Sequence, residues 1–310
     1  MSTKAVVAAS VAIVVAGLPS ASAGSPGAGS LTTADGSATF MVAPAGGTTT
    51  ITKIRGSDRT AQVTRRLPGS FTVPVVAGIK EGLTGNGRTL ALESHPAANQ
   101  AKFVLLDTRT LRVVRTLSLA GIYSFDAISP DGSKLYVLRF LSRDGTHYAV
   151  QALDTRSSRP VARTVVEKGE PGEAMSGRAL TRTSSPDGSW VYTLYDGARE
   201  TPFVHALSTV DAYTVCIDLD NLEGRSDLSV LELALNPRTN ILAVKRAGAV
   251  VATINTDGFE VTAVRAAPAS RVAAANDAPR DIPWLIVGLV AVGVVATTTL
   301  LLSGARRARV

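Results

Sequence analysis

Cysteine is almost absent from this sequence, and histidine is scarce. Cys216 is the single cysteine among 310 residues, so a disulfide within one chain is excluded. We expect Cys216 to be a small apolar core residue of a strand over residues 214–217, with an exposed thiol for intermolecular pairing as the alternative. Only three histidines are available as general bases. No G-x-S-x-G, P-loop or G-x-G-x-x-G motif occurs, so catalysis has little support and we expect no cofactor.

Charge is also sparse, at 18% of residues, although the net charge is +7. Of the 32 basic residues, Lys4 lies near the N-terminus and Arg306, Arg307 and Arg309 lie at the extreme C-terminus. The remaining 28 nearly balance the 25 acidic residues, and no dense Lys/Arg stripe with interleaved aromatic residues occurs. We therefore expect no nucleic-acid partner.

The N-terminal residues 1–23 have the parts of a secretory signal peptide. Lys4 supplies a positive charge, and an uncharged apolar segment of 13 residues follows over residues 5–17. Ala21 and Ala23 are small residues at the −3 and −1 positions of a cleavage site. Because the apolar segment is too short to span a bilayer, we predict cleavage after Ala23. An uncleaved anchor is the alternative.

A second apolar segment lies near the C-terminus, where residues 284–302 form a run of 19 without a charge. As a helix it would be about 28 Å long, which matches the hydrocarbon core of a membrane. The arginines that follow it are expected to stay in the cytoplasm. We predict one transmembrane helix over residues 282–302 and a basic cytoplasmic tail over 303–310, which makes the membrane an expected partner. A buried core helix is the alternative, and no LPxTG-like sortase motif precedes the run.

One phrase recurs between these two ends. Residues 128–137 (ISPDGSKLYV) return as residues 183–192 (TSSPDGSWVY), and weaker copies lie on both sides. Aligned on their turns, the units are spaced 51, 45, 56 and 51 residues apart. The equivalent turn positions are Gly36, Gly87, Gly132, Gly188 and Thr239. After each turn, short alternating or β-branched segments indicate four strands per unit.

Four-stranded units at this spacing are typical of propeller blades, since one such sheet buries its faces only against neighbours. We predict an all-β fold, a five-bladed β-propeller of four-stranded blades over residues 31–266. A β-sandwich is the rival, but it does not explain the regular spacing. Residues 24–30 are a flexible start, and the Ala-, Pro- and Arg-rich residues 267–281 are a spacer between propeller and membrane.

The order of strand, SPDG turn, x-L-Y-V strand and D-T-x-x turn resembles the YVTN-type repeats of secreted bacterial β-propellers, which are related loosely to WD-repeat proteins. The whole arrangement is similar to uncharacterised membrane-anchored propellers of high-GC Gram-positive bacteria. The resemblance implies the fold and leaves the function open, because propellers host enzymes, receptors and scaffolds alike. Units one and five depart from the pattern at the turn, so we expect blade one to be irregular.

If the SPDG turn joins the first two strands of each blade, the loops between strands two and three lie on the opposite face, with the connections between blades. The resemblance implies that this opposite face and the central channel carry ligands. The longest connection spans residues 167–178, and long loops on a rigid scaffold often carry function. A structural loop with solvated charges is the alternative. The predicted binding residues of this connection are Glu167, Lys168, Glu170, Glu173 and Arg178.

The loops in the middle of the units add further candidates. They are His95, His147, Tyr195 and Asp196. If His95 and His147 approach each other across neighbouring blades, they could form a metal site together with a carboxylate. No HxH or HExxH spacing in the sequence supports such a site. His205 at a strand start is expected to be packed or at an edge. Residues 218–224 lack the spacing of an EF-hand calcium loop and are expected to form a turn.

Together these observations predict a single-pass protein of the cell membrane, with its propeller outside the cytoplasm. We expect it to act as a binding module at the cell envelope, with a protein, a glycan fragment or a small molecule as partner. The alternative is a metal-dependent, lactonase-like hydrolase with its site at the channel. A third interpretation is signalling, which would need a partner's membrane span because the predicted tail is short.

Overall fold

The computed structural model describes residues 29–94, 99–142, 145, 147–161, 165, 175–198 and 201–264. The chain divides into two units, Met1–Ala266 and Ala267–Val310, and every described residue belongs to the first. The predicted signal peptide, spacer, membrane helix and tail therefore lie outside the described residues. Within the described ranges, no helix combines the length and apolarity that a membrane crossing requires.

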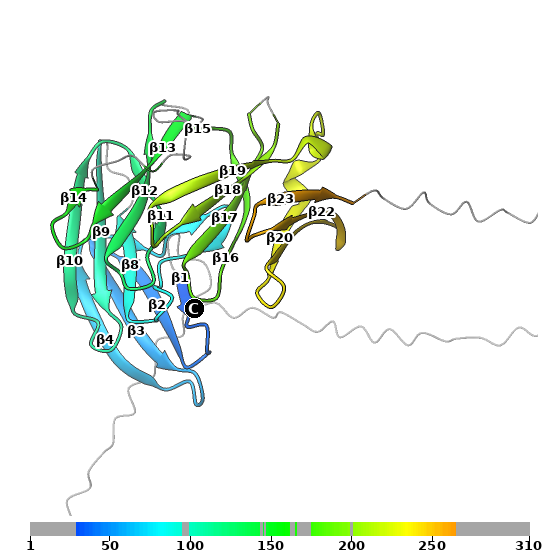
Figure 1. The fold of residues 1–310 in the computed structure, drawn as a ribbon. Helices are drawn as coiled ribbons and strands as arrows, with labels where there is room; N and C mark the ends of the chain where they lie inside the picture. Colours follow the sequence, from blue (N-terminus) through cyan, green and yellow to red (C-terminus); the bar gives the residue numbers. More distant parts are fainter. Residues whose placement is uncertain are drawn as a thin grey trace, which may run out of the picture. The chain divides into compact units, whose positions relative to one another are not determined.

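Strands form nearly all of the regular structure, in five sheets built on a four-stranded plan (Figure 1). Sheet 1 contains β1 (Gly29–Thr32), β2 (Ala38–Ala45), β3 (Thr48–Arg55) and β4 (Ala61–Pro68). Sheet 2 contains β5 (Phe71–Thr72), β8 (Thr89–Ser94), β9 (Gln100–Asp107) and β10 (Val113–Ala120). A small hairpin, β6 (Val75–Val76) and β7 (Ile79–Lys80), is inserted between β5 and β8.

The next sheets repeat this plan in chain order. Sheet 3 contains β11 (Tyr123–Ile128), β12 (Lys134–Phe140), β13 (His147–Asp154) and β14 (Arg159–Pro160), and β15 (Met175–Ser176) also pairs with β13. Sheet 4 contains β16 (Ala179–Ser184), β17 (Trp190–Tyr195), β18 (Phe203–Ser208) and β19 (Tyr213–Asp218). Sheet 5 contains β20 (Leu231–Asn236), β21 (Ile241–Arg246), β22 (Ala249–Asn255) and β23 (Glu260–Ala263). Two 3-10 helices, η1 (Asp220–Leu222) and η2 (Leu228–Val230), connect sheets 4 and 5. The prediction of an all-β fold of four-stranded units is confirmed.

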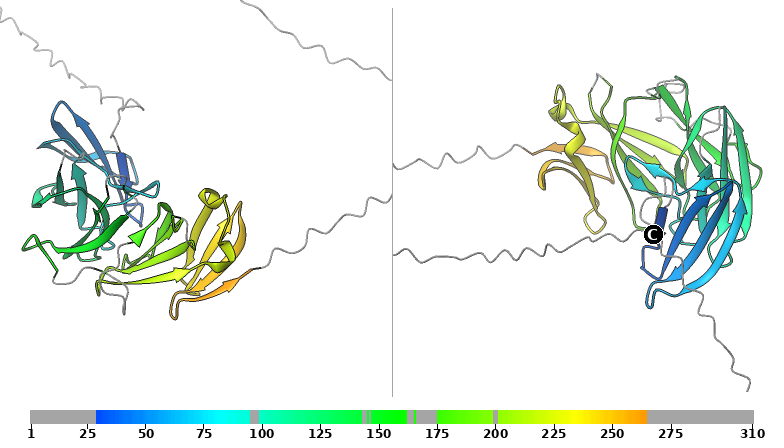
Figure 2. Two further views of the ribbon diagram at one scale, coloured as in Figure 1. Left: turned by 90° about the horizontal axis from the view of Figure 1, so that it is seen from above. Right: turned by 180° about the vertical axis from the view of Figure 1, so that it is seen from behind.

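The sheets follow one another in chain order (Figure 2). Four apolar clusters join each sheet to the next. Phe40 of sheet 1 belongs to one cluster with Leu92 of sheet 2. Sheets 2 and 3 share a cluster, sheets 3 and 4 share another, and the last joins sheets 4 and 5. Strand alternation therefore places large apolar side chains on the faces between sheets, where removing them from water stabilises the fold.

The outer faces of sheets 1 and 5 mix small and polar side chains with a few larger apolar ones, namely Met41, Ile54 and Ile241. On sheet 1, the hydroxyls of Thr32 and Thr39 lie 2.9 Å apart and those of Thr52 and Thr64 lie 3.2 Å apart. On sheet 5, register pairs Ala234 with Ala243 and Ala243 with Thr253. Among the described residues no apolar cluster joins sheet 1 to sheet 5. Polar outer faces keep the ends of a stacked array compatible with water.

The recurring SPDG phrase forms the turn between the first two strands of a sheet, as predicted from the sequence. In sheet 3, the Asp131 carboxylate accepts hydrogen bonds from the Ser129 hydroxyl at 2.7 Å and from the Ser133 backbone N–H at 3.0 Å. Gly132 has a φ of 75°, a conformation that glycine adopts without strain. The same bonds recur around Asp187 in sheet 4. These donors hold the pKa of Asp131 down at about 2, so this carboxylate stays charged.

The D-T-x-x turn is tied to the SPDG turn by a threonine hydroxyl. Thr155 donates to the carbonyl of Gly132 at 2.7 Å, and Thr209 donates to the carbonyl of Gly188 at 2.6 Å. Thr108 makes the equivalent bond to Gly87 in sheet 2. The two halves of the repeated phrase are thus in contact, which explains why they recur together.

The irregularities of the sheets differ from those expected. Sheet 1 has four full strands, with a register shift between Lys53 and Ile54 in the β3–β4 pairing, and its turn repeats the hydrogen bonds of the SPDG turns around Asp35. The irregular unit is sheet 2, where β5 has two residues and Leu83 adds an isolated bridge to Leu90. The inserted β6–β7 hairpin interrupts its first strand. In sheet 5 the positive φ falls on Asn240, at 52°, one position later than in the other turns.

Replacement of Thr209 by valine tests the bond between the two turns. The hydroxyl is buried, so Thr209→Val leaves the Gly188 carbonyl without its donor at nearly unchanged volume. We expect the free energy of unfolding to fall by about 1–2 kcal/mol. Thr262→Val, on the exposed strand β23, is the matched control and should change it by less than about 0.5 kcal/mol. Urea denaturation followed by circular dichroism measures both, and equal effects would contradict the assignment.

Candidate functional site

Three charged side chains from three successive repeat units meet in a buried ionic cluster, which we define as Glu81, Asp126 and Arg182. Arg182 on β16 donates from Nη1 to Asp126 Oδ1 at 3.0 Å and from Nη2 to the Asp126 carbonyl at 2.7 Å. Its Nε lies 3.4 Å from Glu81 Oε1. The side chains are 0% exposed for Arg182, 4% for Asp126 and 20% for Glu81. The cluster therefore contains one cation and two carboxylates.

A bulge in β11 explains the second bond of the guanidinium. The register of β11 with β12 shifts between Phe125 and Ala127, so Asp126 is the extra residue. An extra residue is left out of the strand ladder. Its carbonyl is then available to Arg182, and both its carboxylate and its backbone contact the same side chain.

Electrostatics within the cluster favour a permanently charged arginine. Burial alone would lower the pKa of Arg182, but the carboxylates of Asp126 and Glu81 outweigh it and raise that pKa. The pKa of Glu81 is raised, first by burial and then by the charge of Asp126, while Arg182 opposes the rise. Glu81 is thus the carboxylate whose charge is least well compensated.

Aromatic side chains and a histidine pack beside the cluster. Tyr195 on β17 stacks on Tyr148 of β13 with ring centroids 5.5 Å apart, and its ring meets the edge of His205 at 6.2 Å. His205 on β18 is buried, in line with the packed alternative predicted from the sequence. Burial, with the nearby Arg182 charge, lowers the pKa of His205 to about 4 although Asp126 acts in the opposite direction. His205 is therefore neutral at physiological pH.

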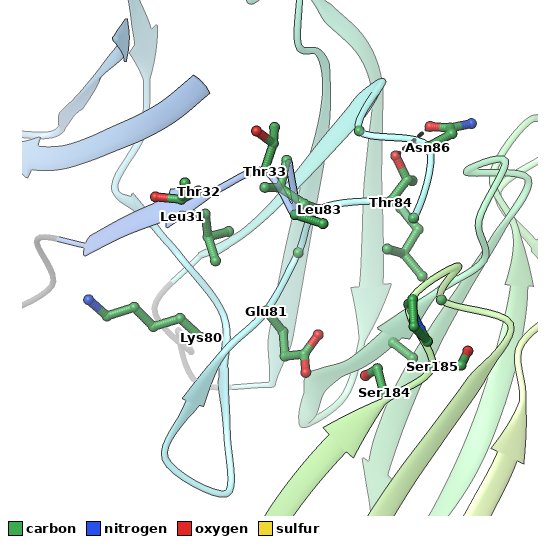
Figure 3. Close-up of a pocket in the computed structure, with 18 of the residues that line it drawn as sticks. Leu31, Thr32, Thr33, Lys80, Glu81, Leu83, Thr84, Asn86, Ser184 and Ser185 are labelled. Carbon is green, nitrogen blue, oxygen red and sulfur yellow. Dashed lines mark hydrogen bonds between the residues drawn. The ribbon is translucent and has the colours of Figure 1, made fainter. Parts of the chain in front are cut away.

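A cavity of about 490 Å³ lies on the face of the SPDG turns, and Glu81 is part of its wall (Figure 3). Residues of sheets 1 to 4 line it, mostly from the turns. The turns approach closely here, since a Cβ on Gly85 would lie 1.8 Å from the Asp187 carbonyl oxygen. Ligands were expected on the opposite face, so this cavity was not anticipated from the sequence.

A second pocket, of about 350 Å³, lies at the opposite ends of the strands in sheets 2 and 3. Val75 and Ile122 in its wall are 56% and 43% exposed. Glu93 also lines it, and its Oε2 accepts the Phe125 backbone N–H at 3.0 Å. This is the face on which the binding loops were expected.

The structure brings two of the predicted binding residues together. The Asp196 carboxylate accepts the Arg178 backbone N–H at 2.7 Å and lies 3.6 Å from the Arg178 Nε. His147 begins β13, is exposed and pairs in register with Ser176. Tyr195 differs from the expectation of a loop residue, because β17 extends through it and buries its ring between sheets 3 and 4. The other candidates, His95, Glu167, Lys168, Glu170 and Glu173, lie outside the described residues.

The ionic cluster was not predicted from the sequence, although the repeats contain a signal for it. Glu81, Asp126 and Arg182 each precede the first turn residue of their unit by three positions. Those turn residues are Thr84, Ser129 and Ser185. One repeat position thus carries a charge of either sign in three successive units, a pattern that an alignment of the units displays.

Successive four-stranded sheets with a buried ionic cluster define a propeller-like β-repeat protein. Residues 127–299 match the family described as Gmad1, lipoprotein LpqB beta-propeller domain, and this chain belongs to that family. No curated protein matches the sequence.

Three solved structures are similar to this chain at low sequence identity. TolB from Acinetobacter baumannii has a TM-score of 0.43 and 15% identity over 76% of this chain and 53% of its own, so this chain spans about half of that TolB chain. The Cps50 (Swd1) β-propeller domain of Myceliophteria thermophila has a TM-score of 0.47 and 10% identity over 76% of this chain and 70% of its own. A putative TolB from Agrobacterium tumefaciens has a TM-score of 0.41 and 14% identity over 76% and 79%.

Removal of the central cation tests the ionic cluster. Arg182→Met keeps an unbranched chain of similar length but leaves two carboxylates without their partner, so we expect the free energy of unfolding to fall by about 3–5 kcal/mol. Arg178→Met is the matched control, because Arg178 is 77% exposed in its pair with Asp196 and should contribute less than about 1 kcal/mol. Chemical denaturation measures both, and a control as damaging as Arg182→Met would contradict this account.

Acidification tests the neutral state of His205. Its pKa is about 4 when folded against 6.5 as the ordinary value, so the unfolded chain binds more protons between these pH values. The free energy of unfolding should therefore fall as the pH drops from 6.5 towards 4, by up to about 1.4 kcal/mol per pH unit from this group.

The raised pKa of Glu81 acts in the opposite direction, since its contribution is lost as the pH rises. The difference between wild type and His205→Asn therefore isolates the histidine. Urea titrations at pH 7.0, 6.0 and 5.0 should show a weaker pH dependence for the variant. Identical slopes for the two proteins would overturn the assignment.

Proposed function

We propose that this protein is a membrane-anchored binding module of the cell envelope. Residues 1–23 direct export, residues 282–302 span the membrane, and residues 303–310 form the cytoplasmic tail. The propeller lies outside the cytoplasm and its partner is a protein or another ligand of the envelope. Support comes from the two apolar terminal segments of the sequence and from membership of a family described by a lipoprotein propeller domain.

Binding is favoured over catalysis because the buried charged groups are bonded to one another. Arg182 is held by Asp126 and Glu81, and the hydroxyl and carboxylate groups of the turns bond to each other. Among the described residues, two of the hollows lie at opposite ends of the strands and can be entered by a ligand.

The alternative of a metal-dependent hydrolase requires three or more acidic or histidine side chains that converge on one ion. In the part of the chain that the structure describes, no such group of His, Cys, Asp and Glu occurs. The carboxylates that do converge, Asp126 and Glu81, face the guanidinium of Arg182, which takes the place of a cation between them. The described residues therefore lend the hydrolase no support.

We also propose that the five sheets are the blades of a five-bladed propeller over residues 31–266. The four apolar clusters join the five sheets in order, and closure of the ring would bring the outer faces of sheets 1 and 5 together, which no apolar cluster of the described residues joins. On the face opposite to the SPDG turns, the exposed Val75 and Ile122 offer contacts to a partner. Arg178 and Asp196 are paired there, and Arg178 lies two residues after β15, before which the predicted binding residues 167–174 lie in the sequence.

Anchoring is tested by truncation. A chain that ends at residue 281 should be recovered from the culture medium, whereas the full chain should sediment with membranes and lose its propeller to external protease in intact cells. The double variant Lys4→Glu, Val11→Asp removes the positive charge and interrupts the apolar segment, so it should keep the protein in the cytoplasm. Membrane sedimentation of the truncated chain to the same extent would contradict the anchor.

Binding is tested by affinity capture with the full anchored chain. Replacement of residues 167–174 by a Gly/Ser segment of equal length keeps β15 and should remove the captured envelope partner. The same replacement of residues 223–226, an exposed connection between sheets 4 and 5, is the matched control and should retain it. An unchanged partner set in the first variant would show that the loop is not the interaction site.

A further inference from the structure

The wall of the cavity on the SPDG face has an excess of negative charge. The ionic cluster behind it contains two carboxylates and one guanidinium, and Asp126 takes the shorter contacts with Arg182. Of the two carboxylates only Glu81 lines the cavity, and its side chain remains 20% exposed. A carboxylate that is desolvated without full compensation is stabilised by a cation placed next to it.

The rest of the wall is consistent with a cationic ligand. Asp35 also lines the cavity, and the hydrogen bond from Thr33, with those from Ser37, lowers its pKa to about 2, so it adds a negative charge. Lys80 is the single basic residue among the described residues of the wall. Figure 3 shows its side chain extending away from the Glu81 carboxylate, which extends toward Ser184.

The remaining groups distinguish between kinds of cation. Apolar side chains, among them Leu31, Leu83 and Val191, line the cavity beside the carboxylate. None of the described lining residues is aromatic, which disfavours a quaternary ammonium group. A divalent metal would need more carboxylate or imidazole ligands than Glu81 offers. A primary ammonium group needs only oxygen acceptors, and the cavity wall contains the two carboxylate oxygens of Glu81 and the hydroxyl of Ser184.

We propose that the cavity binds an alkylammonium group, with the ammonium beside Glu81 and the alkyl chain against the apolar wall. The volume of about 490 Å³ is adequate for such a group. The chemistry is that of a small aliphatic amine or of a lysine side chain of a partner. The inference rests on the proposed binding function and assigns a ligand class to one of its two hollows.

Calorimetric titration of the full chain in detergent with n-butylammonium chloride tests the proposal at constant ionic strength. We expect saturable binding of this probe and none of n-butanol, butyrate, sodium or calcium chloride. Glu81→Gln should weaken the affinity about tenfold or more, because it removes a charge-assisted hydrogen bond. Glu232→Gln, on an exposed position of β20 in sheet 5, is the matched control and should leave the affinity unchanged.

A second variant keeps the test decisive if Glu81→Gln fails to fold by circular dichroism. Lys80→Met removes the competing positive charge from the wall and should tighten binding of n-butylammonium at least about twofold. The proposal is overturned by the absence of saturable binding, by equal affinity for n-butylammonium and sodium, or by full affinity in a folded Glu81→Gln.

The source of the amine is identified by a second pair of probes, Nα-acetyl-lysine methylamide and its Nε-acetylated form. Tighter binding of the free lysine derivative than of n-butylammonium assigns a partner's lysine, and the reverse order assigns a free amine; both support the proposal. Binding of the Nε-acetylated form with equal affinity overturns it. Loss of amine binding with intact affinity capture would refute this inference alone, whereas amine binding without any captured partner would refute the envelope function alone.

Discussion

A four-stranded sheet with two apolar faces is unstable by itself, and the architecture of this protein follows from that constraint. Each inner face is buried against the next sheet in one of four apolar clusters. Among the described residues, no apolar cluster joins the outer faces of the first and last sheets to a neighbouring sheet. These faces include threonine pairs on sheet 1 and alanine and threonine on sheet 5, which are compatible with water. Polar side chains at the ends and apolar side chains between sheets are therefore parts of one solution.

The ionic cluster adds specificity where the apolar clusters add stability. Apolar contacts between similar sheets are tolerant of exchange, since leucine and valine pack against many partners. Arg182 tolerates no such exchange, because its guanidinium must meet the carboxylate of Asp126, the free carbonyl of the β11 bulge and Glu81. Glu81 belongs both to this cluster and to the wall of the cavity on the SPDG face. The same carboxylate therefore links the packing of the sheets to the proposed ligand chemistry.

Much of the fold was predictable because turns and alternation are local signals. The SPDG turn has the same hydrogen bonds at Asp131 and Asp187, and the strands around it follow from their β-branched pattern. The SPDG-like bonds of the first turn were missed because residues 33–37 (TADGS) have threonine and alanine where units three and four have serine and proline, although the bonds to Asp35 are the same. The interruption of sheet 2 by the β6–β7 hairpin was not predicted from the sequence.

The site was less predictable, because it depends on which residues of distant units face one another. Tyr195 was expected in a loop because the sequence does not show that β17 extends through it. The cavity forms where turns of different units approach one another, and the spacing of the turns in the sequence does not predict that approach.

One repeat position holds Glu81, Asp126 and Arg182 in consecutive units, and this constrains how the repeats arose. Copies of a duplicated segment begin identical, and identical charges at one axis would repel each other. The three units have diverged in sign at this position, and charges of both signs are needed for the cluster to be buried. After that divergence the units were no longer interchangeable: a shuffled order would form the same sheets but separate the guanidinium from its carboxylates.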